Sequence, residues 1–86
     1  MEALLAQRGV KGVVVTDGQG LLVHSSGDVP AQPGVVTELM RNARLLDPSG
    51  LAPVVTIDTD NRRVVLTVGE GGGSIAVFTD PPRRLE

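Results

Sequence analysis

The segment from Gly12 to Leu22 constrains the fold more than any other part of this chain. It reads Gly-Val-Val-Val-Thr-Asp-Gly-Gln-Gly-Leu-Leu, a run of β-branched residues followed by a short polar turn. Valine favours strands, whereas Asp17–Gly18 favours a turn, because glycine adopts positive φ and aspartate bonds to its own turn backbone. We therefore predict a β-hairpin with a four-residue loop, in which Gly20 takes a second turn or bulge position.

The hydrophobic pattern along the rest of the chain predicts two helices and three more strands. The longer helix begins at Pro33, which suits a first helical turn, and ends at Asp47 before Pro48. Pro53 opens the third strand and marks it as an edge strand, because proline has no N–H for a ladder. The expected ranges are helices 2–8 and 33–47 and strands 10–16, 21–25, 53–58, 63–68 and 74–79.

Apolar residues on the longer helix form a stripe that is wider than contact with one sheet requires. They occupy positions 35, 36, 39, 40, 43, 45 and 46, at the spacing of an amphipathic helix. A hairpin, a helix and a three-strand meander in this order predict an α+β fold with helices mainly on one face of a sheet. We expect one domain over residues 1–80 and a polar tail over 81–86, whose end resembles a cloning scar as much as a native terminus.

Composition narrows the function classes. Phe78 is the one aromatic residue among 86, so aliphatic side chains must supply a small core, and such cores are often completed by a partner subunit. A net charge of −2 with a single lysine excludes the basic face of a nucleic-acid binder. The chain has no cysteine, which fits a reducing compartment, and it has no recognisable secretory signal or membrane-spanning run.

Two polar motifs are weak candidates for ligand binding. The glycine-rich stretch 69–74 lacks the lysine and the following helix of a phosphate loop, so we predict a hairpin connector there. Asp58, Asp60 and Asn61 lack the glycine and the distal glutamate of a calcium loop, so we predict a turn held by Asx hydrogen bonds.

His24 is the only histidine and the only candidate for acid–base work. A triad with Ser25 or Ser26 and Asp28 is unfavourable, because adjacent residues on a strand point to opposite faces and no nucleophile elbow is present. We interpret His24 as a surface residue of a strand. The sequence thus predicts no catalytic residue, no metal and no cofactor, and favours a protein that is not an enzyme.

Four stretches of the sequence are informative when they are read together. They are Gly12-Val-Val-Val-Thr-Asp-Gly-Gln-Gly-Leu21, Gly34-Val-Val with Leu39, Pro53-Val-Val-Thr-Ile-Asp-Thr-Asp-Asn61 and Gly73-Ser-Ile-Ala-Val77. In this order, and within fewer than 100 residues, they resemble the roadblock/LC7 family, most closely its Ragulator branch. The resemblance extends over nearly the whole chain.

The resemblance implies a profilin-like, five-stranded antiparallel sheet with the long helix packed across it, in the order α-β-β-α-β-β-β. Members of this family dimerise by pairing that helix and the edge strand after it, so that two sheets become one. Carried over to this chain, the implied dimer interface is Val36, Leu39, Met40 and Ala43 on the helix and Val54, Val55, Thr56 and Ile57 on the strand. The alternative is that all of these residues belong to an ordinary core. We expect a part of them to do so, and the sequence alone does not separate the two sets.

The resemblance also implies a function. A Ragulator-type chain would pair with a second roadblock-type subunit, be wrapped by a long scaffold subunit and support Rag GTPase and TOR kinase signalling, indirectly, at the lysosomal surface. It would be a cytoplasmic protein recruited through lipid on the scaffold. The alternatives are a homodimeric roadblock regulator of a small GTPase, a dynein-associated light chain, or a small enzyme or ligand sensor built on the same sheet.

Overall fold

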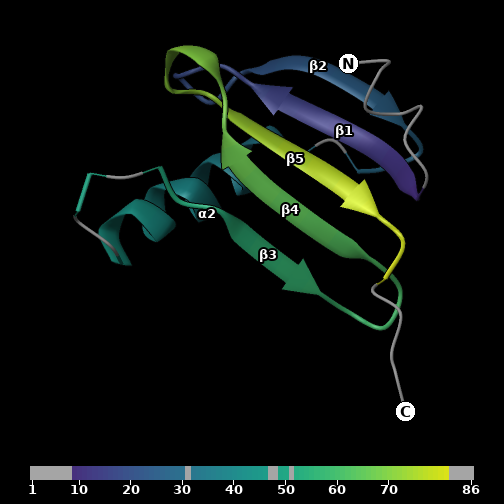
Figure 1. The fold of residues 1–86 in the computed structure, drawn as a ribbon. Coiled ribbons are helices and arrows are strands. Elements are labelled where there is room, and N and C mark those ends of the chain that lie inside the picture. Colours follow the sequence, from purple (N-terminus) through teal and green to yellow (C-terminus); the bar gives the residue numbers. More distant parts are fainter. Residues whose placement is uncertain (1–8, 31, 47–48, 51, 82–86) are drawn as a thin grey trace.

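The computed structural model describes residues 9–30, 32–46, 49–50 and 52–81. The predicted helix over 2–8 and most of the predicted tail lie outside these residues. The elements, labelled as in Figure 1, are β1 (Val10–Thr16), β2 (Leu22–Gly27), α2 (Pro33–Leu46), β3 (Val55–Asp58), β4 (Arg63–Val68), the 3₁₀ turn η1 (Glu70–Gly72) and β5 (Ser74–Thr79).

The strands form one antiparallel sheet in the order β2-β1-β5-β4-β3. Strand β5 lies at the centre between β1 and β4, and β2 and β3 are the two edges (Figure 1). This arrangement confirms the predicted five-stranded α+β fold, and it confirms that the strand after the long helix is an edge. That strand starts at Val55 rather than at Pro53, because its ladder to β4 begins only at Val55.

The turn between β1 and β2 is held by Asp17, as predicted. Its Oδ1 atom accepts hydrogen bonds from the backbone N–H groups of Gln19 and Leu21, at 2.9 and 3.0 Å. The positive φ lies at Gly20 (88°) and not at Gly18. The tight conformation that only glycine adopts easily is therefore two residues later than the Asp-Gly pair indicated.

A register shift between Val15 and Thr16 accompanies this turn. The loop consequently includes Leu21, and β2 runs over Leu22–Gly27 rather than the predicted 21–25. A bulge of this kind adds one residue to one strand and is hard to locate from the hydrophobic pattern.

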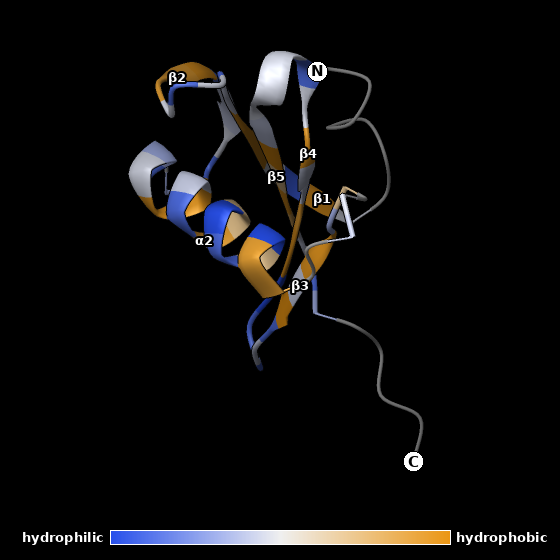
Figure 2. Ribbon diagram, turned by 90° about the vertical axis from the view of Figure 1, so that its left-hand side faces the viewer, coloured by the Kyte–Doolittle hydropathy of each residue, from blue (hydrophilic) through white to orange (hydrophobic). Residues whose placement is uncertain are grey.

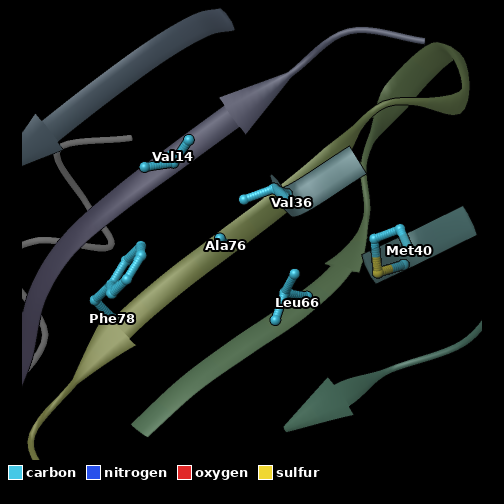
Figure 3. Close-up of a cluster of buried hydrophobic side chains, with 6 residues drawn as sticks. All are labelled: Val14, Val36, Met40, Leu66, Ala76 and Phe78. Carbon is cyan, nitrogen blue, oxygen red and sulfur yellow. The ribbon is translucent and has the colours of Figure 1, made fainter. Parts of the chain in front are cut away.

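The hydrophobic core lies between α2 and one face of the sheet. Figure 3 shows its side chains, which come from the three inner strands β1, β5 and β4 and from the inner side of α2. Its buried members are Val14, Val36, Met40, Leu66, Ala76 and Phe78. The single aromatic ring lies at one end of this cluster, so the core is small and mostly aliphatic.

The turn between β3 and β4 is organised by Thr59. Its hydroxyl accepts hydrogen bonds from the backbone N–H groups of Asn61 and Arg62, both at 3.2 Å. The carboxylate of Asp58 instead accepts two bonds from Arg63, at 2.6 and 3.0 Å. This contact joins the last residue of β3 to the first of β4, so Asp58 closes the hairpin through an ion pair rather than through an Asx bond.

Candidate interaction surface

Helix α2 directs two of the predicted interface residues into the core of this chain. Val36 is 6% exposed and Met40 is 2% exposed, and both pack against the sheet. They are four residues apart and so share one face of the helix. In the single chain, Val36 and Met40 therefore hold α2 on its own sheet, and the part that they would play in a partner interface stays a prediction.

A second row of residues, apolar except at one position, runs along α2 beside this inner face. It consists of Val35, Leu39, Asn42 and Leu46, which we call the α2 stripe. The spacing of four, three and four residues keeps them within about 60° of arc on a helix of 3.6 residues per turn. Leu39 is half-buried, whereas Val35 is 53% and Leu46 is 88% exposed. The row is therefore partly covered by the sheet at Leu39 and open to solvent at its two ends.

The α2 stripe lies on the side of the helix that faces β3. A pocket of about 160 Å³ separates Val35 and Leu39 from Ile57 and Val64, and Phe78 lies in its wall. Ile57 is paired with Val64, and Val55 is paired with Leu66, two residues away along the same two strands. Because Leu66 and Val64 belong to the face covered by α2, Val55 and Ile57 share that face and Thr56 points to the other.

Exposed apolar residues also lie in β3 and immediately before it. Val54 is 65% exposed and Ile57 is 37% exposed. Together with the α2 stripe, residues Val54, Val55 and Ile57 define what we call the α2–β3 surface. Ala43, the remaining helix residue of the predicted interface, is half-buried between the stripe and the core.

Val35 and Leu46 were not among the interface residues implied by the resemblance. Both stood in the apolar pattern of the helix, so the signal for them was present in the sequence. The pattern does not reveal which of two adjacent apolar rows meets the sheet, because that depends on how the helix is rotated about its axis. Figure 2 shows α2 on one side of the sheet, carrying both hydrophobic and hydrophilic residues.

The opposite flank of α2 is polar. Thr37, Arg41 and Arg44, which we call the polar flank, border a pocket of about 230 Å³ shared with Asp17 and Gly72. Arg41 donates to the Glu38 carboxylate at 2.6 Å, and Thr37 donates its hydroxyl to the carbonyl of Pro33 at 2.8 Å. This side of the helix meets the β1–β2 turn and the glycine-rich loop of the same chain.

A further pocket, of about 250 Å³, lies where β1 begins and β5 ends. Its charges are largely matched: Lys11 Nζ lies 3.5 Å from the carboxylate of Asp80, and the Arg62 guanidinium lies 5.8 Å from the centre of the Phe78 ring. Both members of the ion pair are exposed, so it is a weak interaction that is screened by salt.

The candidates for chemistry are accounted for by local contacts. His24 Nε2 is hydrogen-bonded to the hydroxyl of Ser26, two residues along the same strand. The hydrogen bonds from Arg63 lower the pKa of Asp58 below its usual value. Over the described ranges, no three His, Cys, Asp or Glu side chains are grouped so that they could hold a metal ion. The glycine-rich stretch forms η1 and then enters β5, a strand rather than the helix that a phosphate loop requires.

Comparison with known proteins identifies a family and a fold. The family model of the Ragulator complex protein LAMTOR5 matches residues 1–78. A Ragulator complex protein LAMTOR5 homolog from Ixodes scapularis is 34% identical over 77 residues, which are 87% of this chain and 84% of that protein. A homolog of the same description from Nematostella vectensis is 37% identical over 62 residues, which are 70% and 68% of the two chains.

A solved structure supports the fold independently. The crystal structure of a Roadblock/LC7 domain from Streptomyces avermitilis superimposes with a TM-score of 0.73, at 18% identity, over 93% of this chain and 74% of that one. The roadblock/LC7 fold predicted from the sequence is thereby confirmed. In the part of the chain that the structure describes, no helix is long and apolar enough to cross a membrane.

Proposed function

This chain belongs to the family of the Ragulator complex protein LAMTOR5, and we propose that it is a non-enzymatic scaffold subunit that pairs with a second roadblock-type chain through the α2–β3 surface. Its contribution is geometric. Pairing at this surface would join two sheets across the β3 edges and place two helices side by side, which builds a platform for further subunits.

The observation that carries this proposal is the continuity of the α2 stripe with an open sheet edge. An edge strand presents unpaired backbone N–H and C=O groups, which a second strand can satisfy. Here Ile57 of that edge strand and Val35 of α2 are exposed apolar side chains that line the same pocket. Burying one such side chain completely is worth roughly 1.5–3 kcal/mol, so a few of them would support a stable pair.

Membership in a Ragulator family supports the remaining steps of the proposal. We propose that the pair is held by a scaffold subunit that wraps it, and that the assembly supports Rag GTPases and TOR kinase signalling at the lysosomal surface. In this arrangement the chain itself needs neither a cofactor nor a membrane anchor, because the scaffold recruits it.

The test is affinity purification of the tagged chain from its own cells, with quantitative mass spectrometry of the stoichiometric partners. Recovery of a second roadblock-type chain, a wrapping scaffold and Rag-like GTPases is the expected result. Recovery of the chain with itself alone would instead favour a homodimeric regulator of a small GTPase. Recovery with dynein chains would favour a dynein-associated light chain.

A matched pair of variants connects this assay to the surface. Leu39→Asp places a charge on the α2 stripe, whereas Arg44→Asp places the same side chain on the polar flank of the same helix. The proposal requires that the first variant, while still folded, loses the roadblock-type partner and that the second retains it. Equal recovery of the partner with both variants would overturn the surface assignment.

A further inference from the structure

One polar side chain interrupts the α2 stripe. Val35, Leu39 and Leu46 are apolar, but Asn42 stands between them at the same angle on the helix. It is exposed in the isolated chain, where water can satisfy its amide. The amide of asparagine carries one acceptor oxygen and two donor hydrogens, so its requirements change as soon as water is excluded.

Pairing through the α2–β3 surface would cover Asn42, since apolar residues lie a turn before it and a turn after it. An amide buried without partners costs about 1–3 kcal/mol, which is as much as one of the neighbouring leucines contributes. A polar residue at one position of an apolar helix seam fixes register and partner at the expense of stability. The neighbouring residues of the stripe cannot provide a hydrogen bond from their side chains.

We propose that Asn42 is a specificity residue, and that it selects a partner whose helix places an uncharged hydroxyl or amide side chain opposite it. This inference rests on the proposed pairing function and adds the chemistry of the partner. An entirely apolar partner face would leave the Asn42 amide unsatisfied. A carboxylate or an ammonium group at that point would itself be buried without a counter-charge.

The same reasoning limits self-pairing. Contacts across a two-fold axis are reciprocal, so each residue of one copy meets a fixed residue of the other. Within the α2 stripe, only Asn42 of the second copy could hydrogen-bond to Asn42, and this requires the axis to pass beside that residue. Any register that places Asn42 against a different residue of the stripe places it against valine or leucine. Asn42 thus disfavours the nonspecific hydrophobic self-association that a uniformly apolar stripe would allow.

The experiment uses Asn42→Leu and Arg44→Leu in the full chain. Both variants introduce leucine on the exposed side of α2, but the second does so on the polar flank. Affinity is measured for the roadblock-type chain recovered in the purification above, and self-association of each purified variant is measured by sedimentation equilibrium. Asn42→Ser replaces the amide with a hydroxyl, which can still donate and accept a hydrogen bond, and serves as the conservative variant.

We expect Asn42→Leu to weaken pairing about tenfold and to strengthen self-association, because the partner's polar group loses its hydrogen bond while the stripe becomes uniformly apolar. Asn42→Ser should retain most of the affinity, and Arg44→Leu should leave both measurements within about twofold. A melting temperature close to that of the wild type shows that each variant is folded.

Two other outcomes separate the inference from the proposed function. If Leu39→Asp abolishes pairing but Asn42→Leu pairs as well as the wild type or better, Asn42 does not select the partner and only the surface assignment survives. If Leu39→Asp and Asn42→Leu both leave pairing unchanged, the α2–β3 surface is not the interface, and both proposals fail.

Discussion

The two flanks of α2 differ in the parts of the molecule that they face. The α2 stripe, on one side, borders an open pocket against β3 and continues onto an exposed edge strand. The polar flank, on the other, lies against the β1–β2 turn and the glycine-rich loop, and its Arg41 and Thr37 are bonded within the chain. One flank therefore borders loops of the same chain, whereas the other leaves an apolar pocket and a strand edge open, where we propose that a partner binds.

This contrast teaches how an interface is distinguished from a core in a small protein. Exposure alone is insufficient, because Leu45 is 74% exposed yet lies on the outer side of α2, away from the edge strand. What marks the α2–β3 surface is that exposed apolar residues from two elements adjoin each other beside unpaired backbone groups. The following predictions test that distinction, from the largest expected effect to the smallest.

A charge introduced on each flank should give the largest difference in pairing affinity between them. Leu39→Asp should weaken pairing by about 3 kcal/mol or more, over a hundredfold, because a carboxylate without a counter-charge is buried in the interface. Arg44→Asp should change pairing by less than about threefold. Isothermal titration of the purified partner with each variant measures the difference, and similar affinities for the two would contradict it.

Met40 lies on the inner side of α2 and Leu45 on its outer side, so substitutions of the two should affect stability differently. Met40→Ala should destabilise the fold by about 2–5 kcal/mol, because it leaves a cavity under the helix, whereas Leu45→Ala should change stability by about 0.5 kcal/mol or less. In a domain of this size the first change lowers Tm by at least about 10 °C. Thermal unfolding followed by circular dichroism tests this, and equal melting temperatures would argue against the rotation of α2 described above.

The glycine-rich loop beside the polar flank should affect folding and leave pairing intact. A Cβ atom at Gly73 would lie 2.1 Å from the carbonyl oxygen of Thr16, so Gly73→Ala should cost about 1–3 kcal/mol through the shift that it forces on β1. Gly34→Ala is the control, because nothing lies within 4 Å of its Cβ and alanine favours the helix. Chemical denaturation measures the free energies of unfolding. If Gly73→Ala remained folded but no longer paired, the side of the molecule next to the polar flank would take part in pairing, contrary to the prediction.

The smallest effect concerns the end of the edge strand. Hydrogen bonds from the Arg63 guanidinium hold the pKa of Asp58 below its usual value. The ion pair therefore contributes stability above the unfolded-state pKa and loses it as pH falls through the lower folded-state pKa. Asp58→Asn should therefore lower Tm slightly at pH 7, and the difference from wild type should disappear in strong acid. The side chains are partly exposed, so the effect is modest and screened by salt. A difference that persists below the folded-state pKa would have another origin.

Much of the fold was predictable because its signals are local. Strands β1, β4 and β5 were predicted with the observed bounds, since each is a run of β-branched residues between glycine, proline or polar turns. Strand β2 was displaced because the bulge at Thr16 depends on pairing geometry rather than on residue preference. The start of β3 was predicted too early because Pro53 and Val54 are extended in pattern but precede its ladder to β4.

The interaction surface was predictable only in part, for a different reason. The sequence indicated both elements, the helix and the edge strand, but it did not indicate how α2 is rotated. Val36 and Leu39 are equally good interface residues in a hydrophobic pattern, and only packing against Leu66 separates the first as core. The polar interruption at Asn42 became informative once the row that contains it was known to face β3.

The place of β5 in the sheet has a consequence for how the protein is made. This last strand lies between β1 and β4, and the backbone N–H of Ser74 reaches the hydroxyl of Thr16 across 58 positions of the chain. Contacts over such separations form late and slowly, because the intervening loop must first be closed. While the ribosome is still synthesising the C-terminal third, β1 lacks its central neighbour and its valines have no completed sheet to join. A nascent chain in this state is prone to aggregate, so abundance of the protein should respond to changes near β5 more steeply than its equilibrium stability does.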